Sequence, residues 1–465
     1  MELAGKKTLI VGCGKSGIGA TVFLLQEKAH PILFDENGKL TEREVRDHLA
    51  EKIRELGLDL EERAAEVILG KLPAEKESGI ELLVLSPGVP VDTPFVESFL
   101  ARKVPVWGEI ELAWQREKGQ VVAITGTNGK TTTTTLVGEI MERHFETSFV
   151  MGNIGYPYAD IAERTTKHSV TVGEISSFQL ETIESFHPRV SAVLNITPDH
   201  LNRHHTMENY IAAKNNITKN QGKEDYCILN YDNEETRKLG EKCPAKVLWF
   251  SVRRELDEGV FLRGETICLS KNGEKEPLMD VHEMKLVGLC NVENVMAAIL
   301  ISEAMGVPRS EYLEVIRAFR AVEHRIEFVE EVGGVAYYND SKGTNPDAAI
   351  QAIQAMSRPT VLIGGGYDKG SDYDEWVKAF EGKVKLLVLI GQTREKIAVC
   401  ARAHGFDDIV FAETFEEAFR ISRENASAGE AVLLSPACAS WGMFPNYEER
   451  GRLFKKLVYQ VKERM

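Results

Sequence analysis

The stretch VVAITGTNGKTTTTTLVGEI, residues 121–140, joins an apolar run, a glycine-containing loop and a helix-forming segment. Glycines allow a tight turn that directs backbone N–H groups toward phosphate oxygens, and a helix N-terminus and a lysine add positive charge. A threonine after that lysine is a suitable Mg²⁺ ligand. The stretch therefore predicts a strand, a phosphate-binding loop and a helix, with ATP as the natural ligand. The predicted ATP-binding residues of the loop are Gly126, Thr127, Asn128, Gly129, Lys130, Thr131 and Thr132.

The loop matches a short variant of the general pattern G-x-x-x-x-G-K-[ST]. The general pattern has glycine where this chain has Ile124. Kinases and GTPases share such loops, so the motif indicates a nucleotide and leaves the reaction open.

Similar apolar runs recur along the chain and alternate with longer charged stretches of helical period. Runs that are apolar throughout are typical of parallel strands covered on both faces, and ligands bind at the carboxyl ends of such strands. The pattern predicts a parallel α/β fold whose functional residues lie where the runs end. The runs are KTLIVG, PILFD, ELLVLSPG, VVAITG, SVTVGEIS, RVSAVLNIT, DYCILN, VAYYND, TVLIGGG, KLLVLIG and AVLLSPA.

The 465 residues suggest three domains, at roughly 150 residues per domain. Breaks in the pattern near residues 107–120 and 322–328 suggest boundaries. We expect a Rossmann-like N-terminal domain (1–107), a central P-loop ATPase-like domain with a parallel sheet (108–321) and a Rossmann-like C-terminal domain (322–465).

Composition excludes several classes of function. The chain has 56 Lys and Arg against 71 Asp and Glu, a net charge of −15, which argues against binding to nucleic acid or to an anionic membrane. Its seven cysteines include no C-x-x-C pair, so neither a disulfide framework nor a zinc ribbon is indicated. No apolar run approaches the roughly 18 residues of a membrane span. We expect a cytoplasmic protein without membrane insertion, and a monomer.

Acidic and histidine side chains follow two of the runs. Glu174 ends SVTVGEIS, and Asp199 and His200 follow RVSAVLNIT. A carboxylate and an imidazole near phosphates suit Mg²⁺ coordination. The pattern His200, His204 and His205 leaves a zinc site open as an alternative.

The first run leads into G-x-G-x-x-G at residues 12–17, with Asp35 further on. This pattern is also a dinucleotide fingerprint, so an NAD-dependent oxidoreductase is a distant alternative. A non-catalytic nucleotide-binding module is another.

Ten segments occur in an order that resembles the Mur ligases of peptidoglycan synthesis. NDSKGTN and LLSPACAS are characteristic of the members that add D-glutamate. The resemblance implies ATP-dependent addition of D-glutamate to UDP-N-acetylmuramoyl-L-alanine, through an acyl phosphate and a tetrahedral intermediate. Another Mur ligase, or an amide ligase like folylpolyglutamate synthase, is the nearest alternative. The segments are GTNGKT, GNIGYP, EISSFQLE, NITPDHLNRH, AAKNN, NVENVMAA, EHRIE, NDSKGTN, GGGYDKG and LLSPACASWGMFPNYEERG.

The resemblance assigns the metal and catalytic residues. Thr131 and Glu174 would bind one Mg²⁺ and His200 a second. Lys214, which by its surroundings in the sequence alone is a helix-surface lysine, matches the lysine that family members carry as a carbamate and would be a metal ligand in that form. The implied catalytic residues are Lys130, Glu174, His200, Lys214 and Lys342.

The remaining substrate contacts also follow from the resemblance. The adenosine would lie near Asn291 and Asn294, and Arg325, Asp340 and Lys342 would close on ATP from the third domain. The implied D-glutamate residues are Thr344, Lys369, Ser440 and Tyr447, the last commonly Phe in the family.

The first domain would bind the UDP-sugar in place of a dinucleotide. Asn37 stands where some members have Arg. The implied UDP-sugar residues are Lys15, Ser16, Asp35, Glu36, Ser86, Asn153 and His200.

Overall fold

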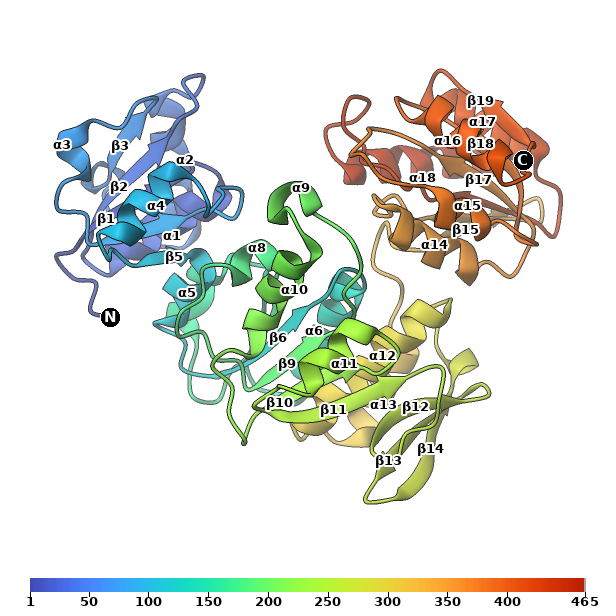
Figure 1. The fold of residues 1–465 in the computed structure, drawn as a ribbon, viewed down its shortest axis with the longest axis horizontal. Coiled ribbons are helices and arrows are strands. Elements are labelled where there is room, and N and C mark those ends of the chain that lie inside the picture. The colour runs from blue at the N-terminus through green and yellow to red at the C-terminus, as the bar shows by residue number, and fades with distance from the viewer. Residues whose placement is uncertain (464–465) are drawn as a thin grey trace. The chain divides into compact units, whose positions relative to one another are not determined.

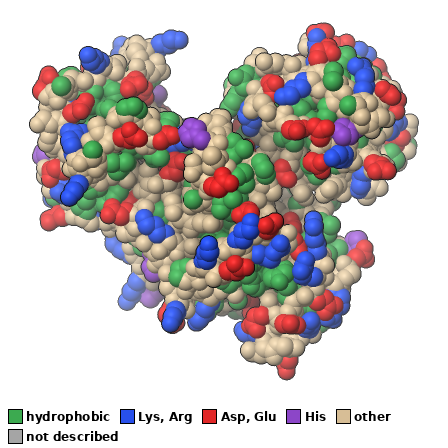
Figure 2. All heavy atoms as spheres, viewed as in Figure 1, with side chains coloured by type: hydrophobic (Ala, Val, Ile, Leu, Met, Phe, Trp, Pro, Cys, Tyr) green, Lys and Arg blue, Asp and Glu red, His purple; other side chains and the backbone are tan. Residues whose placement is uncertain are grey.

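The computed structural model describes residues 1–463, which form two compact units (Figure 1). The first unit comprises Met1–Phe250 together with Ala297–Tyr312. The second comprises Ser251–Met296 together with the chain from Leu313 onward. Acidic and basic side chains are interspersed over the visible surface of the molecule (Figure 2). The predicted α/β class is confirmed.

The N-terminal sheet of the first unit has the strand order β3-β2-β1-β4-β5, and all its strands are parallel. This order reverses direction between β1 and β4, the point at which ligands bind in doubly wound folds. Its strands are β1 (Lys7–Val11), β2 (His30–Asp35), β3 (Glu66–Leu69), β4 (Leu82–Leu85) and β5 (Val106–Gly108). Its helices are α1 (Lys15–Gln26), α2 (Glu42–Glu55), η1 (Glu62–Ala64), α3 (Ala74–Glu77) and α4 (Pro94–Ala101).

A second sheet of the first unit has parallel strands in the order β11-β10-β9-β6-β8-β7. Its strands are β6 (Gln120–Thr125), β7 (Ser148–Gly152), β8 (Val170–Glu174), β9 (Val190–Val193), β10 (Tyr226–Asn230) and β11 (Lys246–Ser251). The accompanying helices are α5 (Glu109–Trp114), α6 (Lys130–His144), α7 (Tyr158–Ile161), η2 (Ala162–Arg164), α8 (Ser177–Leu180), α9 (Leu201–His204), α10 (Met207–Asn215), η3 (Asn216–Thr218) and α11 (Glu234–Gly240). Helices α12 (Leu289–Ala304) and α13 (Arg309–Ala318) each contain residues of both units.

The second unit contains an antiparallel meander of β12 (Gly259–Arg263), β13 (Thr266–Lys271) and β14 (Glu274–Asp280), followed by η4 (Val281–Glu283). The expectation of parallel strands throughout is therefore wrong here. Asn272 and Gly273 connect β13 to β14 with φ of 55° and 81°. An Asn-Gly turn with two positive φ angles matches the twist of a hairpin, so this dipeptide was the available signal.

The C-terminal sheet has the order β15-β16-β20-β17-β18-β19, parallel except for the hairpin of β15 and β16. Apolar clusters cover both of its faces. Its strands are β15 (Glu327–Val332), β16 (Val335–Asn339), β17 (Thr360–Gly364), β18 (Val384–Leu389), β19 (Ile409–Phe411) and β20 (Ala431–Leu434). Its helices are α14 (Pro346–Ala355), α15 (Asp374–Lys378), α16 (Arg394–Ala403), α17 (Phe415–Asn425) and α18 (Tyr447–Glu463).

Every apolar run predicted as a strand contains one. The missed strands include β3, β5, β7, β14, β15 and β19, which lie at sheet edges, where one side of the strand has no neighbour and the sequence is less uniformly apolar. All seven cysteines, each within the described residues, are free. In the described part of the chain, no helix combines the length and apolar character that crossing a membrane requires.

Candidate active site and family

The phosphate loop leaves β6 and enters α6, as predicted. Gly129 caps the helix in the left-handed region at φ 88°, which glycine adopts without strain. Lys130 begins the helix, and its Nζ donates to the carbonyl oxygens of Gly126 and Thr127, each at 2.8 Å. Thr131 and Thr132 follow, both 3% exposed. The loop therefore has its lysine folded back over its own backbone at a helix N-terminus.

Asn195, which the sequence did not single out, fixes the loop from the end of β9. Its Oδ1 accepts from the backbone N–H groups of Thr127 at 3.1 Å and Asn128 at 2.8 Å. Its Nδ2 donates to the carbonyl of Asn128 at 3.1 Å. A signal was available, because Asn195 is a polar residue near the end of the run RVSAVLNIT.

Glu174 is the last residue of β8 and is 1% exposed. It pairs in register with Ile124 of β6, beside the start of the phosphate loop. Asn153, which follows β7, donates from its Nδ2 to Glu174 Oε1 at 2.9 Å. The structure thus brings a predicted metal ligand together with a predicted UDP-sugar residue.

His200 lies in the left-handed region at φ 54° and caps α9. Its side chain is 45% exposed, its backbone N–H donates to Asp199 Oδ1 at 2.8 Å, and its ring lies 5.0 Å from that of Phe178. An exposed imidazole at the end of a parallel strand can reach a ligand at that sheet edge.

The zinc alternative is not supported. His204 is buried and contacts Ser177 Oγ at 2.9 Å, whereas exposed His205 contacts Asp92 Oδ2 at 2.8 Å. Among the described residues, the clusters with metal-ligating spacing do not include these histidines. Those clusters are Asp374, Cys400 and His404, and Glu323, His324 and Glu327.

Lys214 is buried in α10 with 2% of its surface exposed, so its interpretation as a helix-surface lysine is wrong. Its Nζ donates to the carbonyl of Gly126 at 2.7 Å and lies 4.7 Å from the ring centroid of Tyr210. The Tyr210 hydroxyl contacts Thr127 Oγ1 at 3.0 Å. Burial, and secondarily the charge of Lys130, hold the pKa of Lys214 well below its ordinary value. Lys214 therefore supports the phosphate loop and is shifted toward the neutral amine.

Five of the predicted UDP-sugar residues lie at the carboxyl ends of β1, β2 and β4, whereas Asn153 and His200 follow β7 and β9 of the second sheet. Asp35 accepts from the backbone N–H groups of Cys13 and Asn37, both at 2.8 Å. Ser86 Oγ donates to the carbonyl of Gly12 at 3.5 Å. Lys15 and Glu36 are exposed and Ser16 is half-buried. The structure gathers these five residues at the carboxyl edge of the N-terminal sheet.

In the second unit, Asp340 follows β16 and is buried. Its Oδ2 accepts from Ser435 Oγ at 2.7 Å and its Oδ1 from the N–H of Ile326 at 3.2 Å. Burial raises the pKa of the Asp340 carboxyl to about 7, although Arg325 opposes the shift. This carboxyl is therefore tied to the loop after β20, and with a pKa of about 7 it is about half protonated at neutral pH.

Arg450, absent from the predicted site, joins the loops after β16 and β20. It is 1% exposed; its Nε donates to Ser341 Oγ at 3.0 Å and its Nη2 to the Ser341 carbonyl at 2.8 Å. Two further N–H groups lie 3.3 Å from the carbonyl of Cys438. Because it contacts backbone carbonyls and a hydroxyl, no charge pattern in the sequence could have revealed its role.

Three of the four predicted D-glutamate residues lie on loops at the carboxyl edge of the C-terminal sheet, and Tyr447 begins α18. Thr344 follows β16, exposed Lys369 follows β17, and buried Ser440 follows β20. Lys342 Nζ lies 5.4 Å from the ring centroid of Tyr447. The topology therefore places these residues at one end of the sheet.

Asn291 and Asn294 lie one turn apart on α12, and each is 6% exposed. Asn294 Nδ2 donates to Asn291 Oδ1 at 3.2 Å, and Asn291 Nδ2 donates to the carbonyl of Val287 at 2.8 Å. Amide pairs of this kind can present both donors and acceptors to a base or a ribose.

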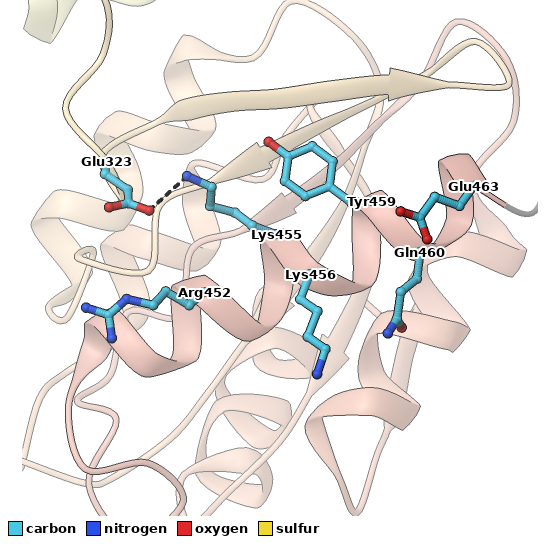
Figure 3. A pocket seen from close by; sticks show the side chains of 7 residues that line it. All are labelled: Glu323, Arg452, Lys455, Lys456, Tyr459, Gln460 and Glu463. Carbon is cyan, nitrogen blue, oxygen red and sulfur yellow. Dashed lines mark hydrogen bonds and ion pairs between the residues drawn. The ribbon is translucent and has the colours of Figure 1, made fainter.

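A pocket on the outer face of α18 has no relation to the predicted site. Figure 3 shows Lys455 turned toward Glu323, at 2.8 Å between Nζ and Oε1. Its lining residues are Glu323, Arg452, Lys455, Lys456, Tyr459, Gln460 and Glu463, none of which was predicted to bind substrate.

A phosphate loop between a strand and a helix, with buried Glu174 on the neighbouring strand, is typical of nucleotide-binding α/β proteins with parallel sheets. Family models then match along most of the chain: the Mur ligase MurD-like N-terminal domain over residues 6–108, the Mur ligase middle domain over 124–302 and the Mur ligase glutamate ligase domain over 324–438. The chain belongs to the Mur ligase family, and the predicted resemblance and three-domain class are confirmed.

Full-length relatives narrow the class to one branch of the family. A protein of Lachnoclostridium phytofermentans named UDP-N-acetylmuramoylalanine–D-glutamate ligase is 54% identical over 464 residues, covering 100% of both chains. Proteins of the same name from Lachnospira eligens and Clostridioides difficile are 52% and 44% identical, covering 98% and 99% of this chain and 99% and 100% of their own.

Solved structures agree on the fold. UDP-N-acetylmuramate-alanine ligase MurC from Thermotoga maritima has a TM-score of 0.60 at 19% identity and covers 98% of this chain and 100% of its own. MurF ligase from the same organism, in complex with ADP, has a TM-score of 0.59 at 15% identity and covers 92% of this chain and 95% of its own. The fingerprint at residues 12–17 thus belongs to a Mur ligase domain, and the oxidoreductase alternative loses its support.

Proposed function

We propose that this enzyme joins D-glutamate to UDP-N-acetylmuramoyl-L-alanine at the expense of ATP, a step of peptidoglycan precursor synthesis. The observation that carries the proposal is the 54% identity, over the whole of both chains, to a protein named for this reaction. The phosphate loop supplies the matching chemistry, because a carboxylate must be phosphorylated before an amine can displace its oxygen. We place the enzyme in the cytoplasm, as a monomer, with domain boundaries at 107/108 and 321/322.

The reaction divides into two transfers. A carboxylate oxygen of the alanyl group attacks the γ-phosphorus of ATP, the bond to the β-phosphate oxygen breaks, and ADP leaves. The amine nitrogen of D-glutamate then attacks the acyl-phosphate carbon, and the tetrahedral intermediate expels phosphate as the amide forms. The ammonium protons are lost to solvent. Positioning and charge stabilisation supply most of the catalysis in such transfers.

The phosphate loop would hold the triphosphate of ATP. Lys130 supplies a positive charge already held at the helix N-terminus, and the Thr127, Asn128 and Gly129 backbone turns around it. Asn195 keeps this turn in shape through three hydrogen bonds. A preorganised loop loses little freedom when the nucleotide binds.

Two Mg²⁺ ions would be held by Thr131, Glu174, His200 and Lys214 as a carbamate. The hydroxyl and carboxylate are hard oxygen donors, and Glu174 is a carboxylate withdrawn from water next to the loop, which suits a cation. Bound Mg²⁺ would screen the charge of the γ-phosphate. The lowered pKa of Lys214 favours the neutral amine, which is the form that adds carbon dioxide.

The UDP-sugar would bind at the reversal point of the N-terminal sheet. Asp35 and Ser86 shape the turn that follows β1, and Lys15 and Ser16 begin the helix that would face the diphosphate. Glu36 would lie near the uracil. Asn153 and His200 would reach the muramoyl group from the second sheet.

We assign the remaining substrate contacts to residues of the second unit. Asn291 and Asn294 would contact the adenosine. The phosphate end of ATP would be contacted by Arg325, Asp340 and Lys342. Thr344, Lys369, Ser440 and Tyr447 would hold D-glutamate, with Lys369 paired to its side-chain carboxylate.

A phosphate-release assay tests the proposal. Release should require ATP, UDP-N-acetylmuramoyl-L-alanine and D-glutamate together and fall to background when any one is omitted. A panel of other acceptors, including L-glutamate, L-alanine and diaminopimelate, is the control. Release stimulated by one of these and not by D-glutamate would show that the acceptor is wrong.

A further inference from the structure

Arg203 has no role in the proposed reaction so far, although it lies within α9, the helix that His200 caps. Its side chain is 12% exposed. Nη2 donates to the carbonyl of Val89 at 3.0 Å and to Glu181 Oε2 at 2.7 Å, and Nη1 lies 3.5 Å from the carbonyl of Gly88. The planar fork of an arginine is suited to holding several acceptors in a fixed geometry.

One side of Arg203 holds the turn that follows β4. In this turn the Val89 N–H donates to the Ser86 carbonyl at 2.9 Å, and the Ser86 N–H donates to the Val11 carbonyl at 3.0 Å. The guanidinium thus binds Val89 at the end of this turn, and Ser86 at the start of the turn is hydrogen-bonded to Val11 of β1. Shifting Val89 would move Ser86, the residue proposed to meet the UDP-sugar.

The other side of Arg203 contacts Phe178, whose ring lies against that of His200, a proposed Mg²⁺ ligand. Its guanidinium carbon lies 5.1 Å from the ring centroid of Phe178, and that ring lies 5.0 Å from the ring of His200. Glu181, which accepts from Arg203, also contacts His204 Nδ1 at 3.3 Å. Phe178 lies within helix α8 and Glu181 caps its C-terminal end, and this helix begins three residues after Glu174.

The same two segments line one small cavity, which is bounded by the β4 turn and by α8. Residues of the turn and of α8 therefore face each other directly, with Arg203 at the margin of their contact. The cavity is lined by Leu85, Ser86, Pro87, Val89, Val91, Gly108, Glu109, Phe178, Gln179 and Thr182.

We propose that Arg203 is a positioning residue that couples the UDP-sugar turn at Ser86 to the phosphate site at His200. This inference rests on the proposed function. The alanyl carboxylate and the γ-phosphate must meet at about 3–3.5 Å, and a misplacement of about 1 Å can cost about 100-fold in rate. An arginine that binds both segments sets the distance between the two substrates, although it touches neither of them.

Arg203→Lys and Arg203→Gln test the coupling. Lysine keeps the charge but cannot span the two carbonyls and Glu181 together, and glutamine also removes the charge. We expect kcat to fall about tenfold in the lysine variant and about 100-fold in the glutamine variant, because the two substrates no longer meet at the reacting distance. KM for UDP-N-acetylmuramoyl-L-alanine should rise as well, because the turn at Ser86 shifts. KM for ATP and for D-glutamate should stay within about threefold of the parent value.

Arg116→Gln is the matched control. Arg116 Nε donates to Glu27 Oε1 at 2.7 Å, a similar arginine–carboxylate contact within the same unit but away from both loops. It should leave kcat and all three KM values unchanged. If Arg116→Gln lowers kcat and raises KM for the UDP-sugar as much as Arg203→Gln does, general loosening explains the effect and the proposal fails.

Calorimetric titration separates coupling from loss of stability. In the parent enzyme, the UDP-sugar should tighten binding of a non-hydrolysable ATP analogue about fivefold or more, and in Arg203→Gln that tightening should vanish while the analogue alone binds as before. Unchanged tightening in both Arg203 variants, or none in the parent, overturns the proposal. The titration contains no amino acid, so it remains readable if D-glutamate is not the acceptor. If Arg203→Gln fails to fold, Arg203→Lys carries the same comparison.

Discussion

The two units of this chain each bury a cation, and they use it differently. Lys214 in the first unit is 2% exposed and Arg450 in the second is 1% exposed. Lys214 makes a hydrogen bond to the carbonyl of Gly126, whereas Arg450 makes bonds to Ser341 and Cys438 on two loops. A lysine gives up its proton readily when it is buried, and an arginine does not.

Burial lowers both pKa values, with different consequences. The pKa of Lys214 falls well below its ordinary value, and the neutral amine becomes accessible. The pKa of Arg450 falls to about 10, so its guanidinium stays charged at neutral pH. The difference teaches that burial alone does not define a role: the first cation is suited to chemistry and the second to holding loops together.

Replacing Lys214 should have the largest effect. Lys214→Ala removes the proposed carbamate and should lower kcat by about 10³-fold, comparable to losing a key electrostatic group of an active site. Lys219→Ala is the control, because Lys219 is near in sequence but exposed, and its Nζ donates to the carbonyl of Ile183 at 3.2 Å. Full activity of Lys214→Ala in a phosphate-release assay would contradict the proposal that Lys214 takes part in the chemistry while Arg450 holds loops together.

Arg450→Lys should have the second largest effect, lowering both kcat and the stability of the folded state. Lysine keeps the charge but cannot bind Ser341 and Cys438 together, which should lower kcat about 100-fold and leave buried carbonyls unsatisfied at about 1–3 kcal/mol. Thermal melting and steady-state kinetics measure both. Arg452→Lys, an exposed neighbour on α18, should change neither. Activity lost without any change in melting would mean that Arg450 acts on substrate directly.

Lys369 offers an exposed cation as a third case. Lys369→Ala should raise KM for D-glutamate about tenfold, because one carboxylate partner is lost, and KM for ATP by less than about twofold. Lys385→Ala, whose lysine pairs with Glu430 at 2.7 Å, is the control. Equal changes in both KM values would contradict the assignment of Lys369 to the amino acid.

The smallest effect concerns Asp340, whose pKa is raised from 3.8 to about 7. The folded state keeps this proton while the unfolded state loses it near pH 4, so the group stabilises the fold at low pH, and this contribution declines as pH rises toward 7. Between pH 5 and pH 8, the melting temperature of the parent should fall by about 5 °C more than that of Asp340→Asn. A parent slope that survives the substitution would show that Asp340 is ionised beside Arg450.

Much of the fold could be predicted from the sequence. The apolar runs located the central strands, because strands covered on both faces must be apolar throughout. The edge strands were not predicted, and neither was the meander at residues 259–280, although Asn272-Gly273 indicates a hairpin. Family resemblance supplied the residues of the candidate site, since spacing alone left zinc and dinucleotide alternatives open.

The sequence by itself determined the phosphate loop, because a lysine and glycines between a strand and a helix act locally. Only the tertiary structure decided that Lys214 lies buried against Gly126, that Asn195 braces the loop, and that Arg203 and Arg450 join separate loops. These contacts link residues far apart in the chain through backbone carbonyls and amides. Every residue carries a backbone carbonyl, so the pattern of side chains in the sequence does not predict which of these groups will accept a hydrogen bond.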